Sequence, residues 1–425
     1  MSAREERIAY VMSRFPKVTE TFVLREILEV RRHGAEVSLF PLILEKSGVE
    51  QPEVAELRPV TDDAPLFSLG MIPAHLRRAV KSPWRYVRTA ARVLVSHRGS
   101  RRAFTGALAT FPKAVAMAEK IERSGATRIH AHFANNPALA AWIVHELTGI
   151  PFSFTAHGSD IHRDQSGLRQ KVAASDFTVM ISEYNRRFVA ERCGEDLLPK
   201  MTVVHCGIDG DAFSPGEPEE RSTFEILCVA ALRAVKGHKT LIDACAQLRD
   251  AGVDFRCTLI GEGPLRETLE AQLAEKGLED QVLLEGAKPG PVVRDRMRTA
   301  DVVVLPSIQD AQGRREGIPV TLMEAMSCET PVVSSRISGI PELVEDGRSG
   351  LLTEPGDADQ LAEALMRLQG DPELRRELGV RGREKVRSEF ILSDCVSQLV
   401  STWVQRRGTS AEPTTALSGK PLPAR

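Results

Sequence analysis

Short apolar runs alternate with segments of helical periodicity through the first half of the chain. Residues 8–12 form the first run and predict a strand, and residues 37–42 predict the next. The helix between them is expected to be capped by Thr19, Glu20 and Thr21. Its apolar face carries Phe22, Ile27, Leu28 and Val30. This spacing predicts a parallel βαβ unit. Further strands are expected at residues 129–133, 151–156, 177–182 and 201–205.

The same alternation begins again in the second half of the chain. Strands are predicted at residues 225–230, 255–260, 282–285 and 302–305, and a helix is predicted at residues 239–251. Strands that alternate with helices in this way favour a doubly wound parallel sheet. The predicted fold class is therefore α/β, with two Rossmann-like domains.

A stretch rich in glycine, proline and acidic residues, at 207–220, marks the boundary between the two halves. A length of 425 residues suits two domains of about 200 residues each. We therefore expect an N-terminal domain at residues 1–208 and a C-terminal domain at residues 209–385.

The end of the chain has a different pattern. A final helix is expected at residues 386–406, with Trp403 as its largest apolar side chain. Residues 407–425 are polar and proline-rich, which predicts a disordered tail.

Composition narrows the classes of function. The formal net charge of −2 gives no support for nucleic-acid binding. The seven cysteines stand singly, with neither a C-x-x-C pair nor zinc-ligand spacing, as is typical of a reduced cytoplasmic protein. The charged N-terminus is not followed by a signal-like apolar segment, and no apolar run is long enough to span a membrane.

One segment, residues 77–102, is strongly basic and contains no acidic residue. Apolar positions recur through it at helical spacing: Leu76, Val80, Trp84, Val87, Ala91 and Leu94. Such a basic amphipathic segment suits the headgroup layer of an anionic membrane. An ordinary helix that packs on its own domain with a solvated basic face is an equally good interpretation. Nucleic acid is disfavoured, because no stacking aromatics are interleaved.

A candidate anion site lies where Glu316 and Gly317 lead into a predicted helix that carries Glu324. Pro319 is expected in the first turn, where its missing N–H is harmless. The free N–H groups of Gly317, Ile318 and Val320 would then point out of the helix start, which is a common phosphate site. A carboxylate beside phosphate suits hydroxyl groups on a ribose or a sugar. Two solvated glutamates are the plainer interpretation.

Histidines and a glycine turn give further candidates. His130 and His132 alternate on one predicted strand and face the same way, but without a third ligand nearby a structural or substrate-lining role is favoured over metal binding. His157 follows a buried strand, at the sheet edge where open α/β folds bind ligands. Gly261 and Gly263 form a G-x-G turn between a strand and a helix, a moderate signal for phosphate.

These motifs resemble glycosyltransferase family 4, the retaining, nucleotide-sugar-dependent enzymes of the GT-B fold. Glu316 and Glu324 match the two glutamates of the family's E-x7-E motif, and SGIPELVEDGRSGLL matches the segment that follows it. T-A-H-G-x-D around His157, and S-R-F-P with E-T-F near the N-terminus, resemble the exopolysaccharide and colanic-acid branch. The resemblance implies two domains that face across a cleft and a last helix that crosses back to the first domain.

The resemblance also implies roles for residues. Glu316 would contact the transferred sugar, Glu324 the ribose, and the loop between them the diphosphate. Lys236 aligns with the family's diphosphate lysine, but the family's arginine falls on Ala231. We hypothesise that Arg233, two residues on, replaces it. His157 would line the transfer site.

On the acceptor side the pattern departs from the family, because the glycine pair common in the N-terminal loop is absent. Candidate acceptor contacts are Arg14, Thr19, His132 and Asp160.

The expected activity is retaining, metal-independent transfer of a sugar from a nucleotide diphosphate sugar, with UDP favoured over GDP and no cofactor. The expected acceptor is a saccharide linked to a polyprenyl diphosphate, used in exopolysaccharide synthesis at the cytoplasmic face of the plasma membrane. Two alternatives stay open. One is a non-hydrolysing sugar-nucleotide epimerase on the same fold. The other is a nucleotide-sugar-binding protein without turnover, for which Ala231 is the hint.

Overall fold

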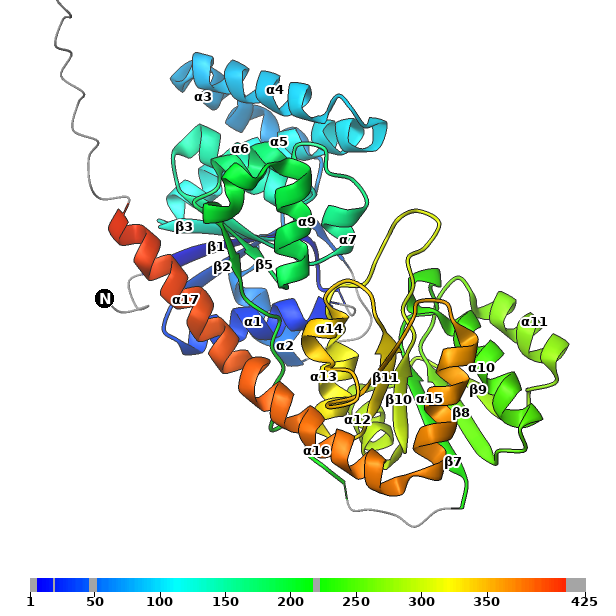
Figure 1. The fold of residues 1–425 in the computed structure, drawn as a ribbon. Helices are drawn as coiled ribbons and strands as arrows, with labels where there is room; N and C mark the ends of the chain where they lie inside the picture. Colours follow the sequence, from blue (N-terminus) through cyan, green and yellow to red (C-terminus); the bar gives the residue numbers. More distant parts are fainter. Residues whose placement is uncertain (1–5, 18–19, 46–51, 217–221, 410–425) are drawn as a thin grey trace, which may run out of the picture.

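The computed structural model describes residues 6–17, 20–45, 52–216 and 222–409, and it forms two lobes (Figure 1). Each lobe contains a six-stranded sheet in which all strand pairs are parallel. Helices cover both faces of each sheet, so the central strands are almost wholly buried. The predicted α/β class with two doubly wound domains is confirmed.

The sheet of the N lobe has the strand order β2-β1-β3-β4-β5-β6. Its strands are β1 (Arg7–Phe15), β2 (Glu36–Leu44), β3 (Arg128–His132), β4 (Phe152–Ala156), β5 (Phe177–Met180) and β6 (Met201–Val203). Its main helices are α1 (Thr21–Arg32), α2 (Pro52–Leu57), α5 (Arg101–Arg123), α6 (Asn136–Thr148), α7 (Ser159–His162), α8 (Leu168–Ala174) and α9 (Glu183–Cys193). Two further helices, α3 (Ile72–Lys81) and α4 (Pro83–His97), lie outside α5 at the top of Figure 1.

The first helix begins close to its predicted start. Glu20 is the N-cap residue of α1, but its side chain makes no capping hydrogen bond and instead pairs with Lys17. Thr19, a predicted cap and acceptor contact, lies outside the described residues.

The sheet of the C lobe has the strand order β12-β11-β10-β7-β8-β9. Its strands are β7 (Phe224–Val229), β8 (Phe255–Ile260), β9 (Val282–Gly286), β10 (Val302–Leu305), β11 (Val332–Ser335) and β12 (Leu351–Thr353). Its helices are α10 (His238–Asp250), α11 (Arg266–Lys276), α12 (Gly290–Thr299), α13 (Val320–Ser327), α14 (Ile340–Leu343), α15 (Ala358–Gly370) and α16 (Pro372–Glu389).

The chain crosses between the lobes at two places that lie side by side. The backbone N–H of Ile208 donates to Phe390 at 2.9 Å, and that of Leu392 donates to Ile208 at 2.9 Å. A Cβ on Gly207 would lie 2.5 Å from the backbone of Leu392, so this close pairing requires glycine. The two crossings therefore form one hydrogen-bonded unit.

After the second crossing, α17 (Leu392–Thr409) returns along the N lobe and packs against α1 (Figure 1). Trp403 is fully buried there, and its Nε1 donates to the Ser153 hydroxyl at 3.2 Å. The helix reaches three residues into the predicted tail, and residues 410–425 lie outside the described part of the chain. Among the described residues, no helix combines the length and the apolar character needed to cross a bilayer.

Candidate active site

A cleft of about 1450 Å³, its open mouth included, separates the two lobes. The N lobe lines it with side chains near the start of α1 and the end of β4, among them Phe22 and His157. The C lobe lines it with residues that follow β7 and β8 and with the segment from Glu316 to Glu324. The carboxyl ends of parallel strands thus meet across the cleft, where open α/β folds bind ligands.

The segment that leads into α13 lines the cleft with residues 317–321. Pro319 has extended backbone angles (φ −71°, ψ 121°) and is the N-cap residue, so the prediction that it lies in the first turn is wrong by one position. Within the described residues, no partner is recorded for the N–H groups of Gly317, Ile318, Val320 and Thr321. Unbonded N–H groups at a helix start favour an anion.

Lys236 and Glu316 form an ion pair on this wall of the cleft. Lys236 ends a short turn, η6 (Ala234–Lys236), and Gly237 follows at φ 71°. A Cβ on Gly237 would lie 1.7 Å from the carbonyl oxygen of Pro306, so only glycine fits there. The turn therefore fixes the lysine beside the loop that carries Glu316.

Glu324 lies one turn into α13 and also lines the cleft. Its carboxylate is 3.8 Å from the guanidinium of Arg25 on the opposite lobe. Burial raises the pKa of Glu324 to about 7, although Arg25 acts to lower it. Glu316, in contrast, belongs to the loop before the helix, so the two glutamates share the cleft but not one helix face.

The G-x-G turn after β8 is close-packed. Gly261 lines the cleft at φ +152°, and a Cβ there would lie 1.9 Å from the Ala230 carbonyl oxygen. Gly263 packs against the backbone of Leu232, where a Cβ would lie 2.5 Å from its carbonyl oxygen, and it does not line the cleft. Its contribution is the shape of the turn.

Ala231 and Arg233 face different hollows. Ala231 lines the main cleft, whereas Arg233 lines an adjoining hollow together with Arg314 and Arg315. Both hollows share Lys236, Glu316 and Gly317. Arg233 therefore reaches the edge of the candidate diphosphate site and does not occupy the place of residue 231.

On the opposite wall, the ring of His157 is held by other side chains. Its Nε2 is 3.1 Å from Nδ1 of His132, and its Nδ1 is 3.7 Å from the thiol of Cys206. Phe22 and Phe133 contact the ring at centroid distances of 5.1 and 4.6 Å. Burial, followed by the charge of His132, lowers the pKa of His157 to about 4, which keeps it neutral at pH 7.

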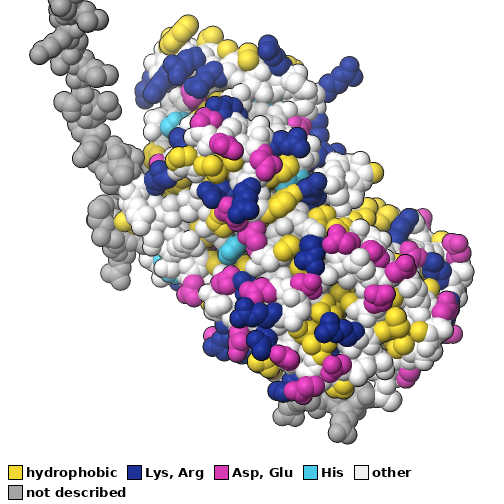
Figure 2. Space-filling model, viewed as in Figure 1, with side chains coloured by type: hydrophobic (Ala, Val, Ile, Leu, Met, Phe, Trp, Pro, Cys, Tyr) yellow, Lys and Arg dark blue, Asp and Glu magenta, His cyan; other side chains and the backbone are white. Residues whose placement is uncertain are grey.

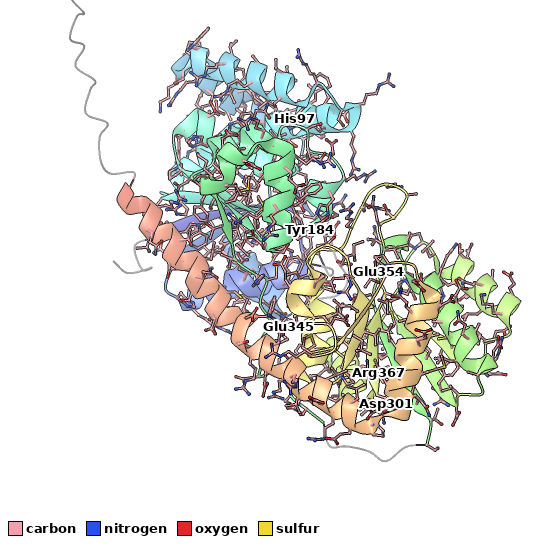
Figure 3. All side chains as sticks on the ribbon, in the orientation of Figure 1. His97, Tyr184, Asp301, Glu345, Glu354 and Arg367 are labelled. Carbon is pink, nitrogen blue, oxygen red and sulfur yellow. The ribbon has the colours of Figure 1, made fainter. Side chains whose placement is uncertain are left out.

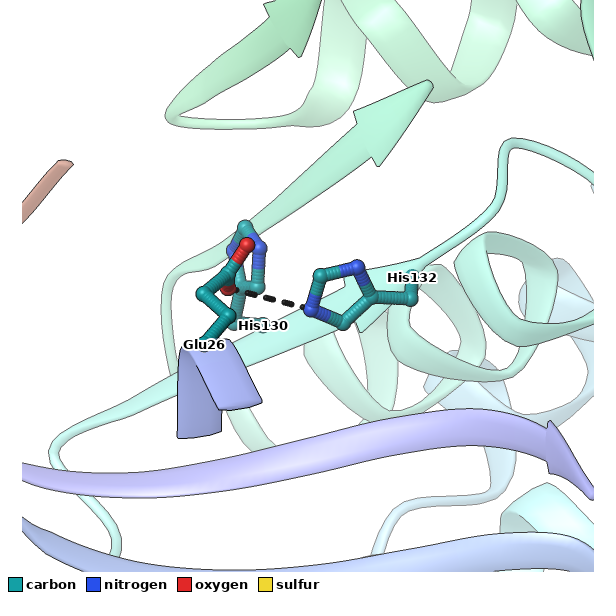
Figure 4. A group of neighbouring side chains, drawn as sticks. All are labelled: Glu26, His130 and His132. Atoms are coloured by element: carbon teal, nitrogen blue, oxygen red, sulfur yellow. Dashed lines mark hydrogen bonds and ion pairs between the residues drawn. The ribbon is translucent and has the colours of Figure 1, made fainter. Parts of the chain in front are cut away.

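Glu26 supplies the third group that the sequence did not reveal beside His130 and His132 (Figure 4). Its Oε1 is 3.1 Å from Nε2 of His132. Glu26 comes from α1, far away in sequence, and so the premise that no third group lies nearby is wrong. Its position four residues after Phe22, on the same face of α1, was the available signal.

The three predicted acceptor contacts that the structure describes do not line the cleft. Arg14 pairs with Glu45 at 2.6 Å away from it, and His132 is fully buried. Asp160 is buried too, and its carboxylate accepts hydrogen bonds from the backbone N–H groups of Ala134, His157 and Gly158 at 2.7 to 3.3 Å. In this conformation His132 and Asp160 support the turn at His157.

The two lobes touch through glycines at the floor of the cleft. A Cβ on Gly317 would lie 2.4 Å from the carbonyl oxygen of His157, and one on Gly158 would lie 3.2 Å from the nitrogen of Gly317. Nearby, the Glu342 carboxylate of the C lobe accepts the N–H groups of Glu183 and Tyr184 at 2.8 and 2.7 Å. Tyr184, on the side of the N lobe nearest the C lobe, is labelled in Figure 3.

Two facing Rossmann-like lobes with a cleft between them are the architecture of the GT-B class. Sucrose-phosphate synthase from Thermosynechococcus elongatus superposes with a TM-score of 0.71 at 18% identity, over 95% of this chain and all of that one. The Anabaena HepE protein in complex with UDP superposes with a TM-score of 0.70 at 18% identity, over 94% of this chain and all of that one. At such identities the likeness establishes the fold alone.

Sequence comparison identifies the family. The model of Glycosyltransferase Family 4 matches residues 19–212, and that of Glycosyl transferases group 1 matches residues 211–385. The chain belongs to the glycosyltransferases that combine these two domains.

Two curated relatives belong to exopolysaccharide pathways. The WcaL glycosyltransferase of Escherichia coli K12, named for colanic acid biosynthesis, is 42% identical over 45% of this chain and 48% of its own length. The amylovoran biosynthesis glycosyltransferase AmsK of Erwinia amylovora is 37% identical over 55% of this chain and 59% of its own length. The matched stretches thus span about half the length of these relatives.

Proposed function

We propose that the protein is a retaining glycosyltransferase that transfers a sugar from a nucleotide diphosphate sugar to a lipid-linked saccharide in exopolysaccharide biosynthesis. The observation that carries the proposal is the row of unbonded N–H groups from Gly317 to Thr321, beside Lys236, on one wall of an interlobe cleft. The names of WcaL and AmsK support the pathway class. The UDP bound to HepE supports UDP as the nucleotide.

In the proposed reaction, the bond between the anomeric carbon and the diphosphate oxygen breaks. The acceptor oxygen bonds to the same face of the sugar, and its proton passes to the departing diphosphate. Negative charge grows on the diphosphate, where Lys236 and the N–H groups after Glu316 would stabilise it. Because these groups supply the positive charge, we expect transfer to continue in the presence of a chelator. Glu316 would hold the sugar and Glu324 the ribose hydroxyls.

The lipid-linked acceptor is supported by the face that α3 and α4 turn outward, which we call the α3–α4 face. Its apolar residues are exposed instead of packed on the lobe, Val80 at 82% and Trp84 at 74%. Further exposed apolar residues on it are Ile72, Leu76 and Val87. In Figure 2 apolar side chains at the top edge lie among basic ones.

Charge on the α3–α4 face favours one occupant, an anionic bilayer. Lys81 and Arg85 on α3 and α4, and Arg98, Arg101 and Arg102 directly after α4, are exposed and have no ion pair within the described residues. Apolar side chains that enter the headgroup layer, flanked by cations, are typical of peripheral membrane binding. A protein docked in this way would meet an acceptor at the inner face of the plasma membrane.

The decisive experiment incubates the purified protein with a panel of nucleotide sugars and a bacterial membrane lipid extract, and reads the products by mass spectrometry. A lipid that gains the mass of one sugar is the expected result. Conversion of the nucleotide sugar without an acceptor product would favour the epimerase. Binding of the donor without turnover would favour a nucleotide-sugar-binding protein that has no enzymatic activity. Ala231, at the position of the family's arginine, is the sequence feature that suggests this alternative.

A further inference from the structure

We propose that Glu26 and His132 are positioning residues that hold the His157 ring in one tautomer and thereby fix the turn at Gly158 against the donor loop. This inference rests on the proposed function, because it assigns a task to groups behind the transfer site. Neither imidazole needs to contact the substrate through a ring nitrogen for this task.

A single chain of hydrogen bonds joins the three side chains. The Glu26 carboxylate lies 3.1 Å from Nε2 of His132, and Nδ1 of His132 lies 3.1 Å from Nε2 of His157. The two imidazole rings are stacked, with an interplanar angle of 26° and a centroid distance of 5.4 Å. The Tyr10 ring also stacks on His132, at a centroid distance of 5.8 Å. The rings therefore have no room to turn without breaking both bonds.

The ionised carboxylate of Glu26, at one end of this series of hydrogen bonds, determines where the imidazoles carry their protons. Burial acts to raise the pKa of Glu26, but the neighbouring imidazoles, His132 first, outweigh it and lower the pKa to about 2. An ionised carboxylate only accepts hydrogen bonds, so Nε2 of His132 carries a proton. Nδ1 of His132 and Nε2 of His157 face each other, so one of them donates and the other accepts, and this pairing selects which nitrogen of neutral His157 carries its proton.

This arrangement closes off both ring nitrogens of His157. Nε2 pairs with Nδ1 of His132 at 3.1 Å, and Nδ1 faces the Cys206 thiol at 3.7 Å. What His157 presents to the donor loop is its backbone carbonyl, which leaves space only for a hydrogen on the α-carbon of Gly317. If the bond to His132 were lost, the ring would be free and the turn would keep only the support of Asp160, while the donor loop would keep its place on the C lobe.

Metal binding by Glu26, His130 and His132 is the competing use of the same side chains. The two ring nitrogens of His130 already meet the hydroxyls of Ser153 and Thr155, at 2.8 and 3.0 Å. A metal would have to displace these bonds and the bond between Glu26 and His132. The hydrogen-bonded chain explains the observed distances without such a displacement.

The test uses the full chain and the variants Glu26→Gln and His132→Phe, of which the second keeps an aromatic ring in the stack. We expect kcat to fall at least tenfold in both, while the Kd for UDP, whose proposed site lies mainly on the C lobe, stays within twofold. The matched control is Tyr10→Phe, which removes a hydroxyl 3.4 Å from the Glu26 carboxylate. It leaves the hydrogen bonds that join Glu26, His132 and His157 intact. It should retain kcat within twofold.

A second readout does not depend on turnover. Long-range ¹H–¹⁵N spectra of ¹⁵N-histidine-labelled protein should show His157 in a single tautomer from pH 6 to 8, and in mixed tautomers in Glu26→Gln. Unchanged kcat in both folded variants, a parallel loss of UDP binding, or the same His157 tautomer in Glu26→Gln would each overturn the proposal. If the wild-type protein transfers no sugar at all, the spectra still decide the positioning role, so the two failures are distinguishable.

Discussion

At the residue scale, the ion pair of Lys236 and Glu316 sets the balance of charge at the candidate donor site. In this conformation the carboxylate neutralises the lysine. A diphosphate that binds the neighbouring N–H groups would compete for the same ammonium group. Lys236 can therefore stabilise the leaving diphosphate only if its ammonium group releases Glu316 and pairs with the diphosphate.

We predict that Lys236→Ala lowers kcat/KM by about 100-fold, because the loss of one donor to a developing oxyanion typically costs about 3 kcal/mol. Steady-state kinetics with the donor identified by mass spectrometry would measure it. Lys239→Ala, an exposed lysine on α10, is the matched control and should be nearly silent. If Arg233→Ala leaves donor binding unchanged while Lys236→Ala weakens it, Arg233 does not replace the residue at 231.

A second prediction concerns the carboxylate of Glu324 and pH. Its pKa in the folded protein, about 7, lies above the usual value near 4.3 for an unfolded chain. The folded state therefore keeps a proton that the unfolded state releases, and this stabilisation is full below about pH 4 and lost as pH rises through 7.

Glu324→Gln is neutral at every pH and should remove this dependence. Relative to the wild type, we expect the variant to gain about 2 kcal/mol of unfolding free energy between pH 5 and pH 8. Urea denaturation at the two pH values measures the difference. If the unfolding free energies of the wild type and of Glu324→Gln changed equally between the two pH values, the carboxyl group of Glu324 would have an ordinary pKa.

At the element scale, α3 and α4 differ from the other helices because they turn an apolar surface outward. Large apolar side chains at such a surface contribute about 1.5–3 kcal/mol each when they leave water. Val80→Asp combined with Trp84→Ala should therefore reduce binding to vesicles of anionic phospholipid at least tenfold, as measured by co-sedimentation. Val292→Asp, an exposed valine on α12 of the other lobe, is the control. Equal binding by both variants would rule out this face as the contact.

The elements themselves could largely be predicted from the sequence, because apolar runs and helical periods are local signals. The strand ends differ from the prediction in both directions. β1 is longer than expected because backbone pairing continues beyond the apolar run at residues 8–12, whereas β5 and β6 each end two residues earlier than expected. The site could be predicted where one segment carries it, as from Glu316 to Glu324. Glu26 and Glu342 could not, because each acts on a segment more than 100 residues away.

At the scale of the whole molecule, Glu342 joins the lobes by accepting two backbone N–H groups at the start of α9. Hydrogen bonds to a charged group, at a helix start that favours anions, are expected to contribute about 2 kcal/mol to the closed arrangement. Glu342→Ala should increase the radius of gyration in small-angle X-ray scattering and lower kcat.

The control for this prediction is Glu345→Ala. That carboxylate also has two partners, Arg348 and Lys385 at 2.7 and 3.2 Å, but both belong to its own lobe (Figure 3). An equal expansion in both variants would mean that Glu342 stabilises the C lobe rather than the contact between lobes.

The return of α17 to the N lobe has a consequence for biosynthesis. Leu399, Val400 and Trp403 complete a core cluster in which most of the other members come from β1, α1 and β2. A ribosome makes those earlier segments long before it makes α17, so an apolar groove beside α1 stays uncovered while the entire C lobe is translated. A premature stop codon just before Leu392 would therefore destabilise the N lobe, although that lobe is synthesised first. Nascent chains are expected to need chaperone protection at that groove.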